Sequence, residues 1–304
     1  MAHNLFQPTH SQESYVGIPS YVANDTESMP KKAKGKKVAA KAEKKAKKGE
    51  EKAHKFKALA ALDAFVLKIK EELARLRKDP ASLFDEPPPK QECPLCMLPI
   101  PFQPDKTVYV NCCGNTICSS CMYAQQKSVD KSNERRDVHS PTTCPFCRKP
   151  KVTDITERLE KRMLLNDPCA FDQASDETPF VENLNNKSGN ASSEEWLGLF
   201  YACRAASMDN LRAVNKLTSL FLCGNRLIAK DTDIACMLLE YTARRGDVSS
   251  RFLLGVNMLS RGPPAAPEDD DFVEITIKFY QDASKHFKMS AARGHKESVN
   301  KLIY

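Results

Sequence analysis

The sequence is poor in apolar residues and contains no long apolar run. Hydrophobic residues make up 41% of its 304 residues, and no run of 18 or more apolar residues occurs, whereas a helix that spans a membrane needs about 20. Residues 1–30 also lack a basic start followed by an apolar segment. We therefore expect no signal peptide, no membrane contact and an intracellular location, in the cytoplasm or the nucleus, where cysteines stay reduced or bind metal.

Aromatic residues are scarce among the lysines of the most basic segment, Lys31–Lys57, where Phe56 is the only phenylalanine, tyrosine or tryptophan. This segment has 13 lysines and 3 glutamates, whereas the whole chain has a net charge of +7, so the remainder is slightly acidic. Without a series of aromatic side chains that could stack on successive bases, sequence-specific recognition of nucleic acid is not expected. The segment fits a nuclear import signal or weak, non-specific contact with nucleic acid, and we expect residues 1–57 to form a disordered, Lys-rich tail.

Cysteine, in contrast, is abundant and regularly spaced. Eight of the 12 cysteines form four pairs in the middle of the chain: Cys93 and Cys96, Cys112 and Cys113, Cys118 and Cys121, and Cys144 and Cys147. A tetrahedral zinc site needs four ligands, so four pairs supply two closed sites without an open position for a reactive water. A module of this size with few large apolar side chains also depends on metal to fold. The spacing therefore predicts two structural Zn²⁺ ions and excludes a hydrolytic zinc enzyme.

The motifs Cys-Pro-Leu-Cys, Cys-Cys-Gly-Asn-Thr-Ile-Cys-Ser-Ser-Cys and Cys-Pro-Phe-Cys-Arg resemble those of a RING-type zinc finger. We expect this finger, a small α+β fold, at residues 90–151. The resemblance implies that the first and third cysteine pairs share one ion and that the second and fourth pairs share the other. A RING finger usually has a histidine where this chain has Asn115. Cys112 replaces it, which resembles the all-cysteine C4C4 subclass, and Gly114 and Asn115 are then expected only to turn the chain.

The resemblance also implies a function, that of a RING-type E3 ubiquitin transferase. Such a finger holds a ubiquitin-conjugating enzyme, charged with ubiquitin, in a reactive geometry without a covalent intermediate. The family's apolar contact surface for that enzyme corresponds to Leu95, Pro145 and Phe146, and its basic linchpin corresponds to Arg148. Many active RING fingers have a large apolar residue at the position of Gln125, so the choice of conjugating enzyme stays open. The alternative is a zinc-dependent interaction adaptor without ligase activity.

Two segments that flank the finger have helical patterns. Apolar residues recur every three or four positions in residues 58–79, which predicts an amphipathic helix. This helix packs either on the zinc module or C-terminal part of the chain, or on a second copy as a short coiled coil. Residues 152–193 are expected to form a helix and polar linker: a helix with Asp154 as N-cap, closed by Asn166-Asp167-Pro168, and then a loop over residues 172–193.

Residues 194–304 repeat a pattern of helix and turn. Ala213-Val-Asn-Lys-Leu217 returns as Ser298-Val-Asn-Lys-Leu302, and Ser250-Arg-Phe-Leu-Leu254 lies 37 residues after the first copy. Such a period is typical of stacked helix pairs. Together with Ala291-Ala-Arg-Gly294 the pattern resembles Sel1-like repeats, which implies a concave face that binds a client protein. An unrelated globular helical domain is the alternative.

The remaining cysteines have no metal-binding spacing, and we expect them to be small apolar side chains in helices. They are Cys169, Cys203, Cys223 and Cys236. The only tryptophan, Trp196, is expected in the core. The sequence thus predicts a multidomain protein with a disordered basic N-terminus, a zinc-stabilised α+β RING finger and an all-α C-terminal domain of Sel1- or TPR-like helical repeats. Such a protein would bridge a charged ubiquitin-conjugating enzyme to a client.

Overall fold

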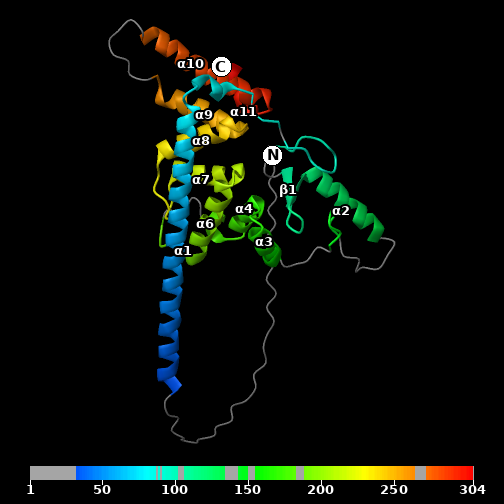
Figure 1. The fold of residues 1–304 in the computed structure, drawn as a ribbon, viewed down its shortest axis with the longest axis vertical. Coiled ribbons are helices and arrows are strands. Elements are labelled where there is room, and N and C mark those ends of the chain that lie inside the picture. Colours follow the sequence, from blue (N-terminus) through cyan, green and yellow to red (C-terminus); the bar gives the residue numbers. More distant parts are fainter. Residues whose placement is uncertain are drawn as a thin grey trace, which may run out of the picture. The chain divides into compact units, whose positions relative to one another are not determined.

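The computed structural model consists of helices and one small antiparallel sheet (Figure 1). It describes residues 32–86, 88–89, 91–101, 106–133, 143–149, 155–182, 188–263 and 272–303. The elements are α1 (Lys32–Leu76), the 3₁₀ helix η1 (Pro80–Phe84), β1 (Thr107–Val110), β2 (Asn115–Cys118), α2 (Ser119–Asn133), α3 (Ile155–Leu164), α4 (Pro168–Asp176), α5 (Pro179–Glu182), α6 (Ser193–Ser207), α7 (Leu211–Cys223), α8 (Thr232–Arg244), α9 (Val248–Arg261), α10 (Phe272–Ala292) and α11 (Lys296–Ile303). The chain divides into two compact units, residues 1–44 and 45–304. In the part of the chain that is described, no helix combines the length and the apolar character needed to cross a bilayer.

Helix α1 begins well before the amphipathic helix that the sequence predicts. Residues 32–57, which we expected to belong to a disordered tail, are helical. Lysine and alanine dominate this segment and are strong helix formers, and a helix propagates readily from a turn that is already fixed. The packed half of α1 supplies that turn, so residues 32–57 continue the helix where the sequence predicts part of a tail. Residues 1–31 lie outside the described part of the chain.

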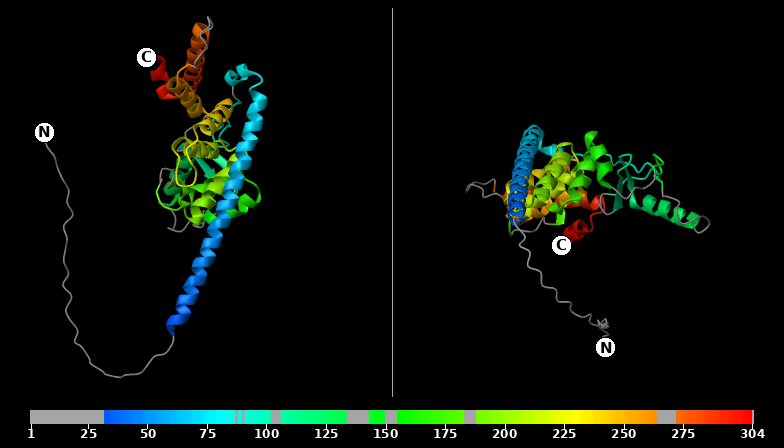
Figure 2. Two further views of the ribbon diagram at one scale, coloured as in Figure 1. Left: turned by 90° about the vertical axis from the view of Figure 1, so that its left-hand side faces the viewer. Right: turned by 90° about the horizontal axis from the view of Figure 1, so that it is seen from below.

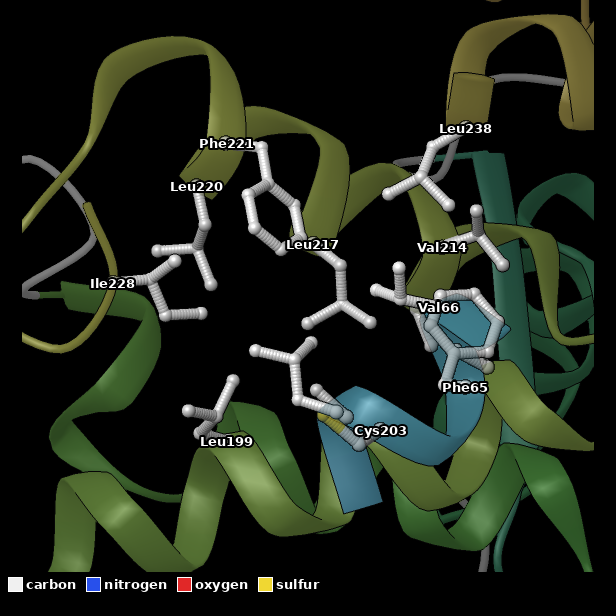
Figure 3. Close-up of a cluster of buried hydrophobic side chains, with 14 of the residues drawn as sticks. Phe65, Val66, Leu199, Cys203, Val214, Leu217, Leu220, Phe221, Ile228 and Leu238 are labelled. Carbon is white, nitrogen blue, oxygen red and sulfur yellow. The ribbon is translucent and has the colours of Figure 1, made fainter. Parts of the chain in front are cut away.

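The apolar stripe of α1 packs against the C-terminal helices, which is one of the two arrangements considered for residues 58–79. Leu62, Phe65 and Leu73 are at most 5% exposed. They share one core with buried residues of α6, α7 and α8, and Figure 3 shows Phe65 among side chains from these helices. The C-terminal half of α1 therefore lies along the helical domain (Figure 2).

Polar contacts fix α1 and η1 to helices that come much later in the sequence. Nζ of Lys68 donates to the carbonyl oxygen of Ser207 at 2.8 Å, across 139 residues of sequence, and to Oδ1 of Asp209 at 2.9 Å. Nη1 of Arg251, in α9, donates to the carbonyl oxygen of Leu83 at 2.9 Å, across 168 residues. α1 and η1 thus form a strap that contacts more than one helix pair.

The structure differs from the polar loop expected over residues 172–193. α4 ends inside this segment and α5 lies within it. Asp172 is only 3% exposed, and its Oδ1 lies 2.6 Å from Nζ of Lys216, in α7, which compensates the buried charge. Its charge is therefore buried and paired, which a hydrophobicity pattern cannot reveal. The expected N-cap Asp154 lies outside the described residues.

Four helix pairs share the same connection: α3–α4, α6–α7, α8–α9 and α10–α11. Each turn contains one residue with positive φ, namely Asn166 (55°), Asp209 (64°), Gly246 (90°) and Gly294 (92°). The next residue in each turn is Asp167, Asn210, Asp247 or His295, whose N–H donates to the carbonyl oxygen five positions earlier at 3.0–3.2 Å. The side chain of that residue accepts a backbone N–H of the following helix. This is the Schellman arrangement joined directly to a helix N-cap, and the α3–α4 copy is one that the sequence pattern did not indicate.

Helices α7 and α11 contain the same sequence, Val-Asn-Lys-Leu, at the same position after the turn, but its burial differs. Val214 and Leu217 are 0% exposed, whereas Val299 is 44% and Leu302 is 40% exposed. α7 packs against α8 and shares a core with α1. Among the described elements, α11 packs mainly on α10. The same residues thus have different surroundings in the two copies.

Candidate functional site

The eight paired cysteines lie on two loops and on the β1–β2 hairpin with the helix that follows it. The first and last pairs each lie in a tight loop between Cys-x-x-Cys residues. Cys112 and Cys113 lie in the turn between β1 and β2, where Val108 pairs with Ile117 across the sheet. Cys118 ends β2, and Cys121 lies in the first turn of α2. The hairpin and α2 therefore present the two middle pairs to the loops that carry the outer pairs.

The structure brings these cysteines together in two groups of four. They are Cys93, Cys96, Cys118 and Cys121, and Cys112, Cys113, Cys144 and Cys147. The pairs interleave as the resemblance implied, with the first and third in one group and the second and fourth in the other. Within each group all four sulfur atoms lie within 4.8 Å of one another.

The sulfur positions fit a tetrahedral metal ion. A tetrahedron with sulfur atoms about 2.3 Å from a central ion has edges of about 3.8 Å. The measured sulfur–sulfur distances include Cys96–Cys118 at 3.9 Å, Cys113–Cys144 at 3.7 Å and Cys112–Cys147 at 3.4 Å. Four thiol ligands leave no position for a water, so such an ion would be structural. Both tetrads could therefore bind a metal ion.

The two outer pairs sit in loops with the same backbone hydrogen bonds. The loop bonds are Cys93 N–H to Leu98 O at 2.8 Å, Met97 N–H to Cys93 O at 2.9 Å, Cys144 N–H to Lys149 O at 2.9 Å and Arg148 N–H to Cys144 O at 3.0 Å. Met97 and Arg148, each directly after the second cysteine, have φ values of 57° and 56°. We call these loops the first knuckle (residues 93–98) and the second knuckle (residues 144–149).

The backbone of each knuckle also favours the thiolate form of the first cysteine in that knuckle. Burial raises the pKa of Cys93, but backbone N–H groups, that of Cys118 foremost, donate to its sulfur and lower the pKa to about 6. The pKa of Cys144 falls to about 7 through the same balance. Cys121 has its pKa raised to about 12, chiefly by its hydrogen bond to Cys118. In the first tetrad the thiol of Cys93 thus ionises more readily than that of Cys121, and a cation at the centre would favour the thiolate form of its ligands.

Asn115 occupies the position of the usual RING histidine, and its side chain contacts a cysteine of the second tetrad. Its Nδ2 lies 3.3 Å from Sγ of Cys113 and donates toward it. Gly114 has a φ of 78°, the left-handed conformation expected from its place in the turn. Four cysteine sulfur atoms already supply the four ligands of the second site, so Asn115 contacts a candidate ligand and is not needed as one.

The residues expected to bind a conjugating enzyme lie in the two knuckles. Leu95, in the first knuckle, is 41% exposed. In the second knuckle Pro145 is exposed, Phe146 is half-buried and Arg148 is exposed. The side chains of both knuckles are therefore accessible in part. Gln125 differs from an apolar contact residue, because its Nε2 donates to the carbonyl oxygen of Thr143 at 3.0 Å, directly before the second knuckle.

The structure also shows a contact that the sequence did not indicate, between the hairpin and the α3–α4 turn. The hydroxyl of Tyr109, in β1, donates to Oδ2 of Asp167 at 2.7 Å. Nε of Arg162 donates to the same oxygen at 2.9 Å. Burial and then this hydrogen bond raise the pKa of Tyr109. A Cβ on Gly114 would lie 2.5 Å from Cζ of Arg162, so only glycine lets the cysteine-bearing turn approach this ion pair.

The other cysteines do not join a tetrad in the described part of the chain. Cys203 is 0% exposed in the helical core, and burial raises its pKa. Cys223, in contrast, is exposed at the end of α7. Trp196 is 4% exposed in α6, with Nζ of Lys55 5.2 Å from its ring centroid. The single tryptophan therefore reports on the core between α1 and α6.

Comparison with known proteins gives one family. Residues 3–212, more than two thirds of the chain, match the family model described as the SIP5 protein N-terminal domain. The matched span contains α1, the cysteine module and the helices up to α6, and it ends in the first turn of α7. The description mentions neither a RING finger nor a Sel1 repeat, and no curated protein and no solved structure gives a significant match. Because the match covers most of the chain, this protein belongs to the family of the SIP5 protein N-terminal domain.

Proposed function

We propose that the protein is a RING-type E3 ubiquitin ligase with two structural zinc ions. The observation that carries the proposal is the interleaved pairing of the two cysteine tetrads, with a partly exposed knuckle at each. The same interleaving is a property of the RING fingers that the cysteine motifs resemble. Zinc is the metal that best suits closed, four-thiolate, tetrahedral sites of this kind. It would hold the two knuckles in a fixed relative position.

The proposed mechanism is positioning and needs no covalent step. Leu95, Pro145 and Phe146 would form an apolar contact with the conjugating enzyme, which carries ubiquitin as a thioester. The guanidinium of Arg148 has several donors in one plane, which suits simultaneous contact with carbonyl groups of ubiquitin and of the enzyme. Holding both partners in a reactive orientation accelerates transfer because less rotational freedom must be lost on reaching the transition state.

In this proposal the C-terminal helices form a Sel1-like solenoid that binds the client. The recurring turns of α6–α7, α8–α9 and α10–α11 support stacked helix pairs, and the α3–α4 turn suggests a further copy. The buried stripe of α1 covers part of α6, α7 and α8. A client must therefore bind beside this strap or on a surface that the strap leaves open.

The test is discharge of ubiquitin from charged conjugating enzymes by the purified, zinc-loaded chain. Leu95→Ala and Arg148→Ala should each slow discharge at least about tenfold, the effect of losing one good contact worth about 1.4 kcal/mol. Leu98→Ala and Lys149→Ala are matched controls, because these residues lie in the same knuckles and are exposed. Arg148 has a positive φ of 56°. Alanine has a Cβ as arginine does, so the conformational strain at this position is the same in the variant. Equal discharge by all four variants, with none slower than the unaltered chain, would end the ligase proposal.

The second candidate is an adaptor without ligase activity, and the contact of Gln125 favours it. Its amide holds the carbonyl oxygen of Thr143, so this position contributes to the shape of the module where many active fingers offer an apolar side chain. An adaptor would keep both metal ions and its partner contacts but would discharge no conjugating enzyme. The discharge assay over a broad panel of these enzymes separates the two candidates.

A further inference from the structure

A groove of about 860 Å³ lies between α1, α4 and α6. Its size falls within the range of about 300–1,000 Å³ that is common for binding pockets. The groove is lined by His54, Phe56, Lys57, Ala60, Ala61, Phe171, Leu197, Phe200, Tyr201 and Arg204. All of these residues lie inside the span that matches the SIP5 family model, so the groove belongs to the part of the chain that defines the family.

The groove exists because large and small side chains face each other across it. On α1, Ala60 and Ala61 leave space beside the helix. On the other side, the rings of Phe171 and Tyr201 lie 6.1 Å apart and those of Phe200 and Tyr201 lie 6.0 Å apart, which forms an aromatic floor. These rings would lose little side-chain entropy on binding because they are already packed on one another.

One wall of the groove carries a large exposed aromatic side chain. Phe56, on α1, is 76% exposed, although burying such a ring stabilises a protein by about 1.5–3 kcal/mol. Phe171, on the floor, is 8% exposed. A ligand with apolar side chains would cover Phe56 and extend the aromatic floor.

The rim of the groove is basic. Lys57 and Arg204 are both exposed, and Cζ of Arg204 lies 5.8 Å from the ring centroid of Phe171. His54 is fixed at the rim by a hydrogen bond of 2.8 Å between its Nδ1 and Oγ of Ser193. None of the groove-lining residues is acidic. An acidic ligand therefore complements this rim, and opposite charges would also speed its association.

We propose that this groove binds a short acidic peptide segment with large apolar side chains on one face, in the manner of an amphipathic helix in a groove. The apolar side chains would lie over Phe171, Phe200 and Tyr201, and acidic side chains would contact Lys57 and Arg204. This inference adds to the proposed function the chemistry of the client, and it does not depend on transfer of ubiquitin.

The test uses two labelled peptides of about 15 residues, near the length at which an isolated helix becomes stable. Both carry leucine and phenylalanine on one face, and the other face is glutamate in one peptide and lysine in the other. The zinc-loaded chain should bind the glutamate peptide at least about tenfold more tightly. Lys57→Glu with Arg204→Glu should abolish this preference, and Ala60→Trp should weaken binding at least about tenfold by filling the groove.

Lys70→Glu is the matched control, because Lys70 is exposed on α1 but does not line the groove. It should bind like the unaltered chain, and circular dichroism should show the same helix content for every variant. Equal affinity for the two peptides, no binding below about 1 mM, or normal binding by Ala60→Trp would overturn the proposal. Arg148→Ala should bind the glutamate peptide normally, so loss of ligase activity and loss of groove binding are separate results.

Discussion

Replacing Leu217 by alanine should destabilise the helical domain far more than the same replacement of Leu302. Both leucines end the sequence Val-Asn-Lys-Leu at the same position after a helix-pair turn. Leu217 is 0% exposed and belongs to the core that α1, α7 and α8 share, whereas Leu302 is 40% exposed. The two variants therefore change the same residue in the same sequence and differ only in what surrounds it.

The expected magnitudes follow from burial. A buried leucine replaced by alanine costs about 2–5 kcal/mol, because apolar contact is lost and a cavity remains. For Leu217 we expect about 3–4 kcal/mol, since it lies among large buried side chains such as those of Phe65 and Phe221 (Figure 3), which hold the cavity open. For Leu302 we expect about 1 kcal/mol, because solvent can fill the space and no cavity forms.

Urea unfolding, followed by fluorescence of Trp196, measures this difference. Trp196 is the only tryptophan and lies in the helical core, so its signal reports on the domain that is altered. With a slope of about 2–3 kcal/mol per M, Leu217→Ala should lower the midpoint by more than about 1 M and Leu302→Ala by less than about 0.5 M. Equal shifts would refute the reasoning, because they would show that α11 is covered as completely as α7.

Three further predictions concern the cysteine module, its contact with α3–α4 and the buried histidine. Cys96→Ser should lower the zinc content, measured by elemental analysis, from two equivalents to about one, because four ligands are needed at each site. Gly114→Ala should cost at least about 2 kcal/mol in urea unfolding, since alanine disfavours positive φ and its Cβ would overlap Arg162. Burial lowers the pKa of His286 to about 4, so between pH 6.5 and 4 the unfolded chain binds the extra proton. Stability should therefore fall by about 2 kcal/mol from pH 7 to pH 5, and His286→Gln should remove that part of the slope.

Each of these predictions has a control in the same chain. Cys223→Ser should keep two equivalents of zinc, because Cys223 is exposed at the end of α7 and outside both tetrads. Gly262 also has a positive φ of 72° but no neighbouring atom within 4 Å of an added Cβ, so Gly262→Ala isolates the cost of φ from that of the overlap. For His286, the free energy of unfolding is measured against pH for the unaltered chain and for His286→Gln. The difference between the two profiles removes the contribution of other titratable groups. A variant profile as steep as that of the unaltered chain would contradict the assignment.

The cysteine tetrads could be predicted from sequence because ligand chemistry allows few spacings. Four pairs admit two closed sites, and the RING resemblance implies the interleaving that the structure has. The helix-pair turns were also detectable, since Gly246 and Gly294 mark positions with positive φ. At the α3–α4 turn the sequence predicts the end of a helix at Asn166-Asp167-Pro168 but a loop in place of most of α4, because the polar residues there resemble a linker.

The missed features depend on contacts between segments far apart in the sequence. A charged residue such as Asp172 favours a loop in a sequence pattern, but in the structure it is buried and paired with Lys216. The contact of Tyr109 with Asp167 joins residues 58 positions apart, and the local motif that contains Asp167 does not indicate this partner. Local patterns indicate helices, turns and ligands, but they do not indicate which polar residues will be buried together.

The strap formed by α1 and η1 has a consequence for synthesis of the protein on the ribosome. The hydrogen bond of Lys68 to Ser207 cannot form until Ser207 has been synthesised, 139 residues later. At roughly 5–20 residues per second, this delay is about 7 to 28 s. During that interval the apolar stripe of the nascent helix has no native partner to cover it. The nascent chain thus exposes a hydrophobic segment that chaperones can bind. In a stalled or truncated product this segment would stay exposed, and protein quality control could recognise it.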